Sequence, residues 1–262
     1  MQTAIIVPAT NRDYYLRHLL SSLPEYLASQ NNINNFNIIV TTQLDDTMFN
    51  RSLSLNVGIK YAVNILNADH IVTHDVDIVP ICNVDYNYQN TFLTWFMTAG
   101  GLNALSSDFI KINGYCNEFV GWGEEDVEII HRARFYQIPV TDYKTIALNK
   151  NPTILNMEFH ESWDSEEMSK RYWGQEWPRF INCKEHGIEY KQVDKNYNWN
   201  QKEYTEANWD RCKRSAALDS LSKDRYYQST GLNQVNLNNL HHVDSNPEQK
   251  LHRLYFETNR II

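Results

Sequence analysis

The order of apolar and amphipathic segments in the first 75 residues constrains the fold of this chain more than any other feature. Three short apolar runs are typical of buried strands, and two longer stretches between them carry apolar residues at helical spacing. The apolar runs are residues 3–7, 36–42 and 71–73, and the helical stretches are residues 16–27 and 53–66. Strands that alternate with helices in this way predict an α/β fold with a mostly parallel sheet flanked by helices.

Polar or charged residues follow each of the three predicted strands, at residues 8–12, 43–46 and 74–77. In an open sheet of parallel strands, ligands bind outside the carboxyl ends of the strands. We therefore expect these three segments to border one ligand site. Residues 100–106 are predicted to be a turn that enters a further strand, and residues 124–135 are predicted to form a helix.

The chain has 262 residues, which is enough for one large α/β domain or for one domain with an appendage. After Asp164 the sequence becomes rich in Asn, Trp, Tyr, Lys and Glu, with only weak periodicity. We therefore predict a core domain at residues 1–164 and a helical or irregular C-terminal extension at residues 165–262. The extension has too many aromatic residues for plain disorder.

The charge and the cysteines exclude several classes of protein. The net charge is −8 without any run of Lys and Arg, so we expect no nucleic-acid partner. The cysteines, Cys82, Cys116, Cys183 and Cys212, lack the spacing of a zinc site or a disulfide framework, and reduced thiols in a cytoplasm are expected. No apolar run approaches the roughly 20 residues of a membrane span. We expect a soluble, cytoplasmic protein, with peripheral contact at an inner membrane face left open.

A pair of carboxylates, Asp75 and Asp77, follows the third predicted strand. Residues two apart on an extended segment project to the same side, so both carboxylates can face one cation together with the phosphate oxygens that it binds. A solvated turn at the end of a strand is the alternative reading of such a pair. His74 before the pair and Pro80 after it are typical of a rigid turn.

A second acidic cluster, residues 121–126 (GWGEED), combines three carboxylates with a tryptophan between two glycines. Acids at a helix N-terminus complement the helix dipole, and this alternative accounts for the carboxylates. It does not account for Trp122, whose ring offers an apolar face to a pyranose, or for the glycines, which let a loop close. The cluster therefore indicates a sugar-binding loop.

Several segments between residues 5 and 163 occur in a specific order. They are residues 49–58 (FNRSLSLNVG), residues 74–77 (HDVD) with Pro80, Gly100-Gly101, and residues 121–126. In this order they resemble the β-1,4-galactosyltransferase family, and related blocks occur in the N-acetylgalactosaminyltransferase modules of bacterial chondroitin polymerases and in polypeptide N-acetylgalactosaminyltransferases. Residues 7–12 (VPATNR) are similar to the family's first nucleotide-binding motif, although Ala9 and Thr10 replace its usual Phe-Arg.

The resemblance implies a GT-A type fold, inversion at the anomeric carbon and a UDP-sugar donor bound with Mn²⁺ or another divalent cation such as Mg²⁺. It implies that Asp77, Met157 and His160 hold the metal, the last two through the spacing MxxH. Taken alone, Met157 is typical of core packing and His160 of a structural histidine. The donor-binding positions implied are Pro8, Arg12, Phe49, Arg51, Asp75, Val76, Thr98, Gly100 and Gly101. Arg12 or Arg51 alone could equally form an ordinary surface ion pair.

On the acceptor side, the resemblance implies that Asp126 is the general base and that Glu125 orients the acceptor. Trp122 and Gly123 belong to the same acceptor-binding loop, and the C-terminal extension is expected to serve acceptor binding or association. Glu124 occupies a position that is usually Gly in the family, so its role is open.

We hypothesise that Thr98 leaves room for a 2-acetamido group, because the family's vertebrate members carry a bulky Tyr at this position. The predicted reaction is transfer of galactose or N-acetylgalactosamine from a UDP-sugar to a glycan or glycolipid acceptor, in bacterial surface polysaccharide synthesis. Two alternatives remain open. The first is a metal-dependent phosphohydrolase of nucleotide-sugars, and the second is a non-catalytic glycan-binding module.

Overall fold

The computed structural model describes residues 1–29, 35–82, 86, 92–95, 101–121, 123–142, 153–156, 158–159, 191–192 and 201–262. The strands are β1 (Thr3–Pro8), β2 (Phe36–Gln43), β3 (His70–Thr73), β4 (Ile78–Cys82), β5 (Phe92–Trp95), β6 (Gly101–Leu105), β7 (Val140–Asp142), β8 (Thr153–Asn156), β9 (Glu158–Phe159), β10 (Lys191–Gln192), β11 (His242–Asn246) and β12 (Leu251–Phe256). The helices are α1 (Asp13–Ser29), α2 (Arg51–Asn64), α3 (Ser106–Lys111), α4 (Glu125–Phe135), α7 (Gln201–Ala217), α8 (Ser220–Ser229) and α9 (Thr258–Ile261), with short 3-10 turns η3 (Leu232–Gln234) and η4 (Leu237–Asn239).

The main sheet has the strand order β11-β12-β2-β1-β3-β6-β5-β7. Strands β12, β2, β1 and β3 are parallel to one another, and β5 is parallel to β7. The pairs β11–β12, β3–β6 and β6–β5 are antiparallel. The predicted α/β fold with a mostly parallel sheet is confirmed, because parallel pairing prevails at the centre of the sheet.

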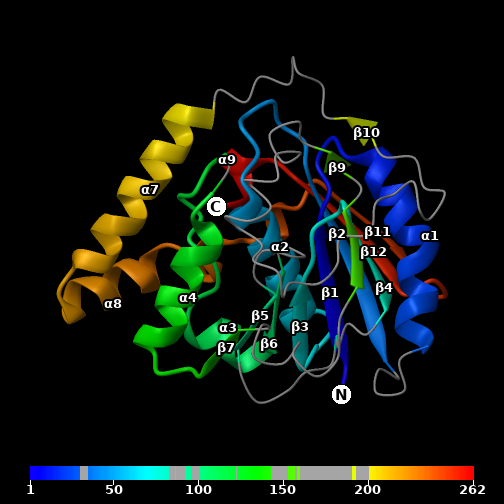
Figure 1. The fold of residues 1–262 in the computed structure, drawn as a ribbon, viewed down its shortest axis with the longest axis horizontal. Coiled ribbons are helices and arrows are strands. Elements are labelled where there is room, and N and C mark those ends of the chain that lie inside the picture. Colours follow the sequence, from blue (N-terminus) through cyan, green and yellow to red (C-terminus); the bar gives the residue numbers. More distant parts are fainter. Residues whose placement is uncertain are drawn as a thin grey trace.

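Helices cover both faces of this sheet (Figure 1). Successive side chains of a strand point to opposite faces, and the two faces of β1 belong to different apolar clusters. Ile5 and Val7 pack with the leucines of α1, whereas Ala4 and Ile6 pack with α2 and α4. Burial on both faces explains why β1 is a continuous apolar run and not an alternating one.

Gly58 allows α2 to lie close to β1. A Cβ atom at this position would come within 2.4 Å of the Ile6 side chain. A larger residue would push the helix away from the sheet and shift its N-terminal residue, Arg51.

The C-terminal segment is part of the same core, contrary to the prediction of a separate extension after residue 164. Strand β12 pairs with β2 inside the main sheet, and Leu254, Phe256 and Ile261 are buried in the cluster that includes α2. Lys60 of α2 donates a hydrogen bond to the carbonyl of Leu232 at 2.9 Å. The edge strand β11 beside β12 is exposed at all five residues, in keeping with its polar sequence.

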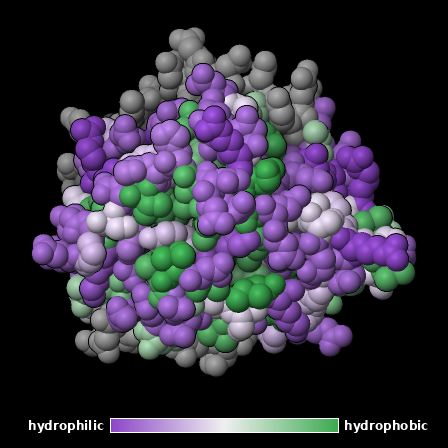
Figure 2. Space-filling model, turned by 180° about the vertical axis from the view of Figure 1, so that it is seen from behind, coloured by the Kyte–Doolittle hydropathy of each residue, from purple (hydrophilic) through white to green (hydrophobic). Residues whose placement is uncertain are grey.

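Helices α7 and α8 do form the predicted helical part, and they project to one side of the sheet (Figure 1). Seen from behind, the molecule is mostly hydrophilic, with apolar residues in several separate patches (Figure 2). Over the described ranges, no helix has the length and apolar character needed to cross a membrane.

Candidate functional site

The carboxyl ends of β1, β2 and β3 lie side by side at one edge of the sheet, as the sequence predicts. Pro8 of β1 is the register partner of Thr41, and Ile6 is the partner of Thr73, the last residue of β3. The segment that contains Asp75 and Asp77 therefore begins next to the end of β1. Parallel register places these polar segments at one site.

Arg51 joins the two acidic clusters of the sequence. It is the first residue of α2, and its Nη2 donates to Oδ1 of Asp75 at 2.8 Å while its Nη1 donates to Oε1 of Glu125 at 3.2 Å. Asp75 follows β3, and Glu125 is the first residue of α4. Burial alone would lower the pKa of Arg51, but the charges of Asp75 and Glu125 outweigh it and raise that pKa, so the guanidinium stays charged.

Glu125 and Asp126 lie in a region that disfavours negative charge. Burial and the neighbouring charge of Asp126 raise the pKa of Glu125 from 4.5 to about 7, although Arg51 acts in the opposite direction. Burial also raises the pKa of Asp126. Oε2 of Glu125 is buried and makes no hydrogen bond to any of the described residues. A carboxylate oxygen without a partner in a buried position is available to a ligand.

The loop before α4 has an unusual backbone. Gly121 and Gly123 have φ angles of 79° and 101°, and Glu124 has a φ of 72°. The left-handed region favours glycine, so a glutamate at this position stores strain. This backbone explains why glycine suits position 124. The side chain of Glu124 makes no capping hydrogen bond to α4.

His74 supports the turn that carries Asp75 and Asp77. Its ring is buried, with Nδ1 donating to the carbonyl of Asp75 at 2.7 Å and Nε2 accepting from the hydroxyl of Tyr86 at 2.8 Å. Burial lowers the pKa of His74 to about 4, so the ring is neutral at physiological pH. Its role is therefore structural.

The first of the predicted metal ligands, Asp77, directly precedes a strand of a two-stranded sheet. Strand β4, which starts directly after Asp77, is antiparallel to β8, and Ile78 is the partner of Asn156. This register brings the end of β8 next to the residue that follows Asp77, and Met157 is next in the chain. Among the described residues, no group of three His, Cys, Asp or Glu side chains could hold a metal. Met157 and His160, the other two predicted ligands, lie outside the described residues.

Two family models match adjoining parts of the chain. The first, the N-terminal region of glycosyl transferase group 7, matches residues 1–90, and the second, the N-terminal domain of galactosyltransferase, matches residues 82–160. β-1,4-Galactosyltransferase 3 of Homo sapiens is 36% identical over 149 residues, which are 51% of this chain and 37% of that protein. This chain belongs to the β-1,4-galactosyltransferase family.

Other members of the β-1,4-galactosyltransferase family give the same result. β-1,4-Galactosyltransferase 1 of Bos taurus is 33% identical over 157 residues, which are 53% of this chain and 38% of that protein. The chain thus spans less than two fifths of the length of these relatives.

The catalytic domain of Drosophila β-1,4-galactosyltransferase 7, solved with xylobiose, matches 97% of this chain and 92% of its own at 22% identity, with a TM-score of 0.59. A mutant of that enzyme with manganese, UDP-Gal and xylobiose has a TM-score of 0.57. This likeness confirms the predicted GT-A type fold.

The structure places the remaining predicted site residues as follows. Pro8 and Val76 are buried, Phe49 is half-buried, and Gly101 is the first residue of β6. The guanidinium carbon of Arg12 lies 5.3 Å from the centre of the Tyr15 ring. Thr98, Gly100 and Trp122 lie outside the described residues, as Met157 and His160 do. The contacts therefore bring together Arg51, Asp75 and Glu125, with Asp126 beside them.

Sequence reasoning missed the asparagines that hold the family's motifs together. Asn50 caps α2 by accepting from the Leu53 amide at 2.8 Å, and its Nδ2 donates to the carbonyl of Asn117 at 2.7 Å. Asn56 donates to the carbonyl of Tyr115 at 2.7 Å. Asn208 of α7 donates to the carbonyl of Val120, directly before the GWGEED loop, at 3.0 Å. A signal was present at Asn50 and Asn56, since both are polar residues in or beside an apolar helix.

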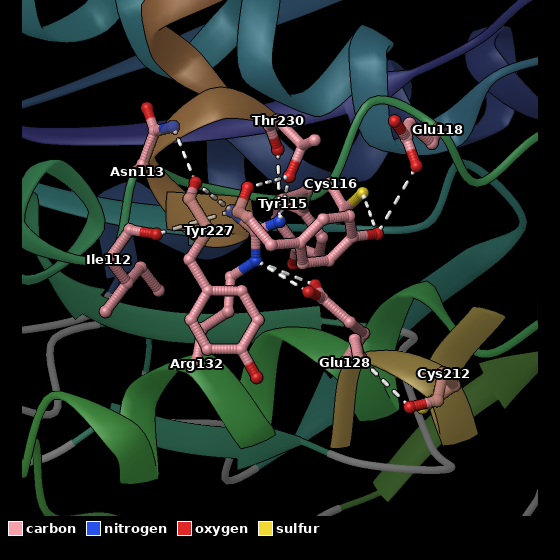
Figure 3. Close-up of polar contacts among 12 residues, drawn as sticks. Ile112, Asn113, Tyr115, Cys116, Glu118, Glu128, Arg132, Cys212, Tyr227 and Thr230 are labelled. Atoms are coloured by element: carbon pink, nitrogen blue, oxygen red, sulfur yellow. Dashed lines mark hydrogen bonds and ion pairs between the residues drawn. The ribbon is translucent and has the colours of Figure 1, made fainter. Parts of the chain in front are cut away.

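A second buried ion pair anchors α4 (Figure 3). Arg132 donates to both carboxylate oxygens of Glu128 at 2.8 and 2.9 Å, and to the carbonyls of Tyr227 and Thr230 at 3.1 and 3.0 Å. Both members of the pair are fully buried. The C-terminal segment is thereby fastened to the helix whose first residues are Glu125 and Asp126.

Proposed function

We propose that this protein is a metal-dependent, inverting glycosyltransferase that transfers galactose or N-acetylgalactosamine from a UDP-sugar to a hydroxyl of a glycan acceptor. The observation that carries the proposal is the contact of Arg51 with both Asp75 and Glu125. This contact brings a predicted donor-binding residue, Asp75, and a predicted acceptor-binding residue, Glu125, to the same side chain. The family supports this chemistry, and a related Drosophila enzyme has been solved with manganese, UDP-Gal and xylobiose.

Asp126 is the proposed general base. It takes the proton of the acceptor hydroxyl as the hydroxyl oxygen forms a bond to the anomeric carbon and the bond from that carbon to the diphosphate breaks. Burial raises the pKa of Asp126, which makes the carboxylate a stronger base than an exposed aspartate. Attack from the side opposite the leaving UDP inverts the anomeric centre.

Glu125 is proposed to orient the acceptor through Oε2, the oxygen that makes no hydrogen bond within the described part of the chain. Trp122 is proposed to supply the apolar face for the sugar ring. Helix α7 is proposed to border the acceptor, which the bond from Asn208 to Val120 supports.

On the donor side, Asp77 with Met157 and His160 would hold the cation. The expected ligand set mixes a carboxylate and an imidazole with a thioether, which is a soft ligand. A divalent cation supplies Lewis-acid stabilisation of the negative charge that develops on the diphosphate. Asp75 is proposed to contact the uridine ribose, and Phe49 and Arg51 to contact the nucleotide.

The experiment that tests the function is an array of UDP-sugars, with and without Mn²⁺, read by calorimetry and then by product formation on xylobiose and other glycan acceptors. We expect UDP binding that depends on Mn²⁺, and transfer from UDP-N-acetylgalactosamine at least as readily as from UDP-galactose, because Thr98 is small. Strict use of UDP-galactose that survives Thr98→Ala would contradict the N-acetylgalactosamine part. Release of free sugar without an acceptor would indicate a phosphohydrolase instead.

The variant Asp126→Asn, measured with the same UDP-sugars, tests the proposed general base. We expect it to lower turnover by about 10²- to 10⁴-fold, the range of a general base, while UDP still binds with Mn²⁺. Near-normal turnover would overturn the assignment of Asp126. Glycan binding that survives both Asp77→Asn and Asp126→Asn, without any transfer by the wild type, would indicate a binding module.

We also propose a biological role, the synthesis of a bacterial surface polysaccharide in the cytoplasm, on a glycan or glycolipid acceptor. Analysis of surface polysaccharide from cells that lack this protein would test it, and an unchanged polysaccharide would contradict it.

A further inference from the structure

The last strand of the chain ends next to the predicted donor site. Strands β2 and β12 are parallel, with Phe256 as the partner of Gln43, and the Leu44 amide donates to the Phe256 carbonyl at 2.8 Å. The chain that leaves β12 therefore reaches the same edge of the sheet as the loop between β2 and α2 (Figure 1). That loop, residues 44–50, leads from β2 to Phe49 and Arg51.

Asp45 connects these two segments through both oxygens of its carboxylate. Oδ2 accepts from the Thr258 amide at 2.5 Å and also from the Thr258 hydroxyl. Oδ1 accepts from the Thr47 hydroxyl at 2.5 Å and from Nε2 of Gln43 at 2.8 Å. Burial opposes the charge, but these hydrogen bonds outweigh it and lower the pKa of Asp45 from 3.8 to about 2. Asp45 is therefore an ionised anchor at physiological pH.

The network continues from Asp45 to the start of α2. Gln43, which is 3% exposed, accepts from the Asn50 amide at 3.0 Å through Oε1. Asn50 caps α2, whose first residue is Arg51. The carbonyl of Phe49 accepts from the Gly121 amide at 3.0 Å, so the same loop also touches the acceptor-side loop.

We propose that Asp45 is a positioning residue for the donor site, anchored by Thr258 at the end of β12. It holds residues 44–50 so that Phe49 and Arg51 are presented to the UDP-sugar before it binds. The inference rests on the proposed function for the identity of the donor. It assigns a role to the C-terminal residues that neither the motifs nor the family models cover, since the models end at residue 160.

The test compares Asp45→Asn with Asp244→Asn, which makes the same charge change on the exposed strand β11. We expect Asp45→Asn to raise KM for the UDP-sugar and the Kd for UDP roughly tenfold, because a donor loop that must be ordered on binding loses preorganisation. We expect kcat to stay within about threefold, since Asp45 touches neither Asp126 nor Glu125. The KM for the acceptor should rise less than the KM for the donor, because in the described part of the chain only the bond from the Gly121 amide to the Phe49 carbonyl links the two loops. Asp244→Asn should match the wild type in all four constants.

Two variants of Thr258 test the anchor. Thr258→Val removes the hydroxyl and should reproduce part of the KM effect, whereas Thr258→Ser keeps the hydroxyl and should restore the wild-type KM. The double variant Asp45→Asn with Thr258→Val should be no worse than Asp45→Asn alone, because both changes break one interaction. Equal KM values for Asp45→Asn and Asp244→Asn would overturn the proposal, as would a fall in kcat with KM unchanged.

Hydrogen exchange separates this inference from the proposed function. In the free protein, Asp45→Asn should speed exchange at the Asn50 and Gly121 amides on the order of tenfold relative to Asp244→Asn, because the loop opens more often. Unchanged exchange at both amides would overturn the positioning role. If the wild type failed to bind any UDP-sugar, the proposed function would be wrong, and the exchange measurement would still decide whether Asp45 holds the loop.

Discussion

Two arginines pair with acids of helix α4, and their surroundings differ: Arg132 is fully buried, whereas the side chain of Arg51 is 15% exposed. Arg132 faces one acid, Glu128, whose two oxygens it binds, and the rest of its guanidinium donates to Tyr227 and Thr230. Arg51 faces Asp75 and Glu125, with Asp126 nearby, and over the described ranges Oε2 of Glu125 has no hydrogen bond. Arg132 thus forms its ion pair within α4, whereas Arg51 contacts the first residue of that helix.

The difference separates an ion pair whose hydrogen-bonding groups are satisfied from a cluster that keeps an acceptor for a ligand. A buried pair whose donors and acceptors are all satisfied holds segments together and has nothing left for a ligand. A cluster in which acids outnumber cations has raised carboxylate pKa values and an open acceptor, and it gains when a substrate hydroxyl or a cation arrives. The Arg51 cluster is of the second kind. Matched substitutions at the two arginines should therefore have opposite consequences.

Arg132→Met should have the largest effect on stability. Removing one partner of a buried pair leaves Glu128 uncompensated, so we expect a loss of about 3–5 kcal/mol in the free energy of unfolding, measured by urea denaturation. Turnover per folded molecule at low temperature should change little. Replacing Glu128 with Met as well should recover part of the loss, because the uncompensated charge is removed. A loss below about 1 kcal/mol for Arg132→Met would show that the pair is not the anchor that its contacts indicate.

Arg51→Met is the matched change in the other cluster. We expect kcat/KM to fall on the order of a hundredfold, because the donor-side and acceptor-side groups lose their common partner. The free energy of unfolding should fall by only about 1 kcal/mol, since Asp75 is partly exposed to water and can be solvated. The pH profile of turnover should also move to higher pH, because Arg51 opposes the rise in pKa of Glu125 and Asp126.

Arg51→Lys is the control for charge. It keeps the positive charge but not the planar fork that reaches two carboxylates, so we expect only partial recovery of kcat/KM. Full recovery would reduce the role of Arg51 to its charge. If Arg51→Met were as unstable as Arg132→Met and had normal turnover, the predicted difference between the two clusters would be wrong.

The smallest predicted effect is a pH dependence of stability. The folded-state pKa of Glu125 is raised from 4.5 to about 7, so the folded protein binds more protons than the unfolded chain between these values. The free energy of unfolding should therefore fall as the pH rises through this window, with a slope from Glu125 of at most about 1.4 kcal/mol per pH unit. Glu125→Gln should remove most of that slope, and Glu248→Gln on the exposed surface should leave it unchanged. A slope that Glu125→Gln does not alter would contradict the raised pKa.

Much of the fold could be predicted from the sequence, because strands and helices follow from local patterns of apolar residues. Strands β1, β2 and β3 are apolar runs that end in polar residues, and the predicted helix at 124–135 is α4 at 125–135. The place of β12 in the main sheet could not be predicted. Its buried residues alternate over only six positions, and nothing in that pattern specifies β2 as its partner. The boundary predicted at residue 164 failed because a short alternating strand in a polar region gives no signal of where it pairs.

The sequence by itself determined the local elements and predicted which residues border the site. Asp75, Asp77, Glu125 and Asp126 were predicted because carboxylates follow a strand or begin a helix there, and because the segments that contain them resemble the motifs of the family. Only the tertiary structure decided which of these groups share a partner. Arg51 contacts Asp75 and Glu125, 24 and 74 residues away, and Asp45 contacts Thr258, 213 residues away. Such contacts depend on how the sheet orders its strands, and strand order is set by the packing of the whole core.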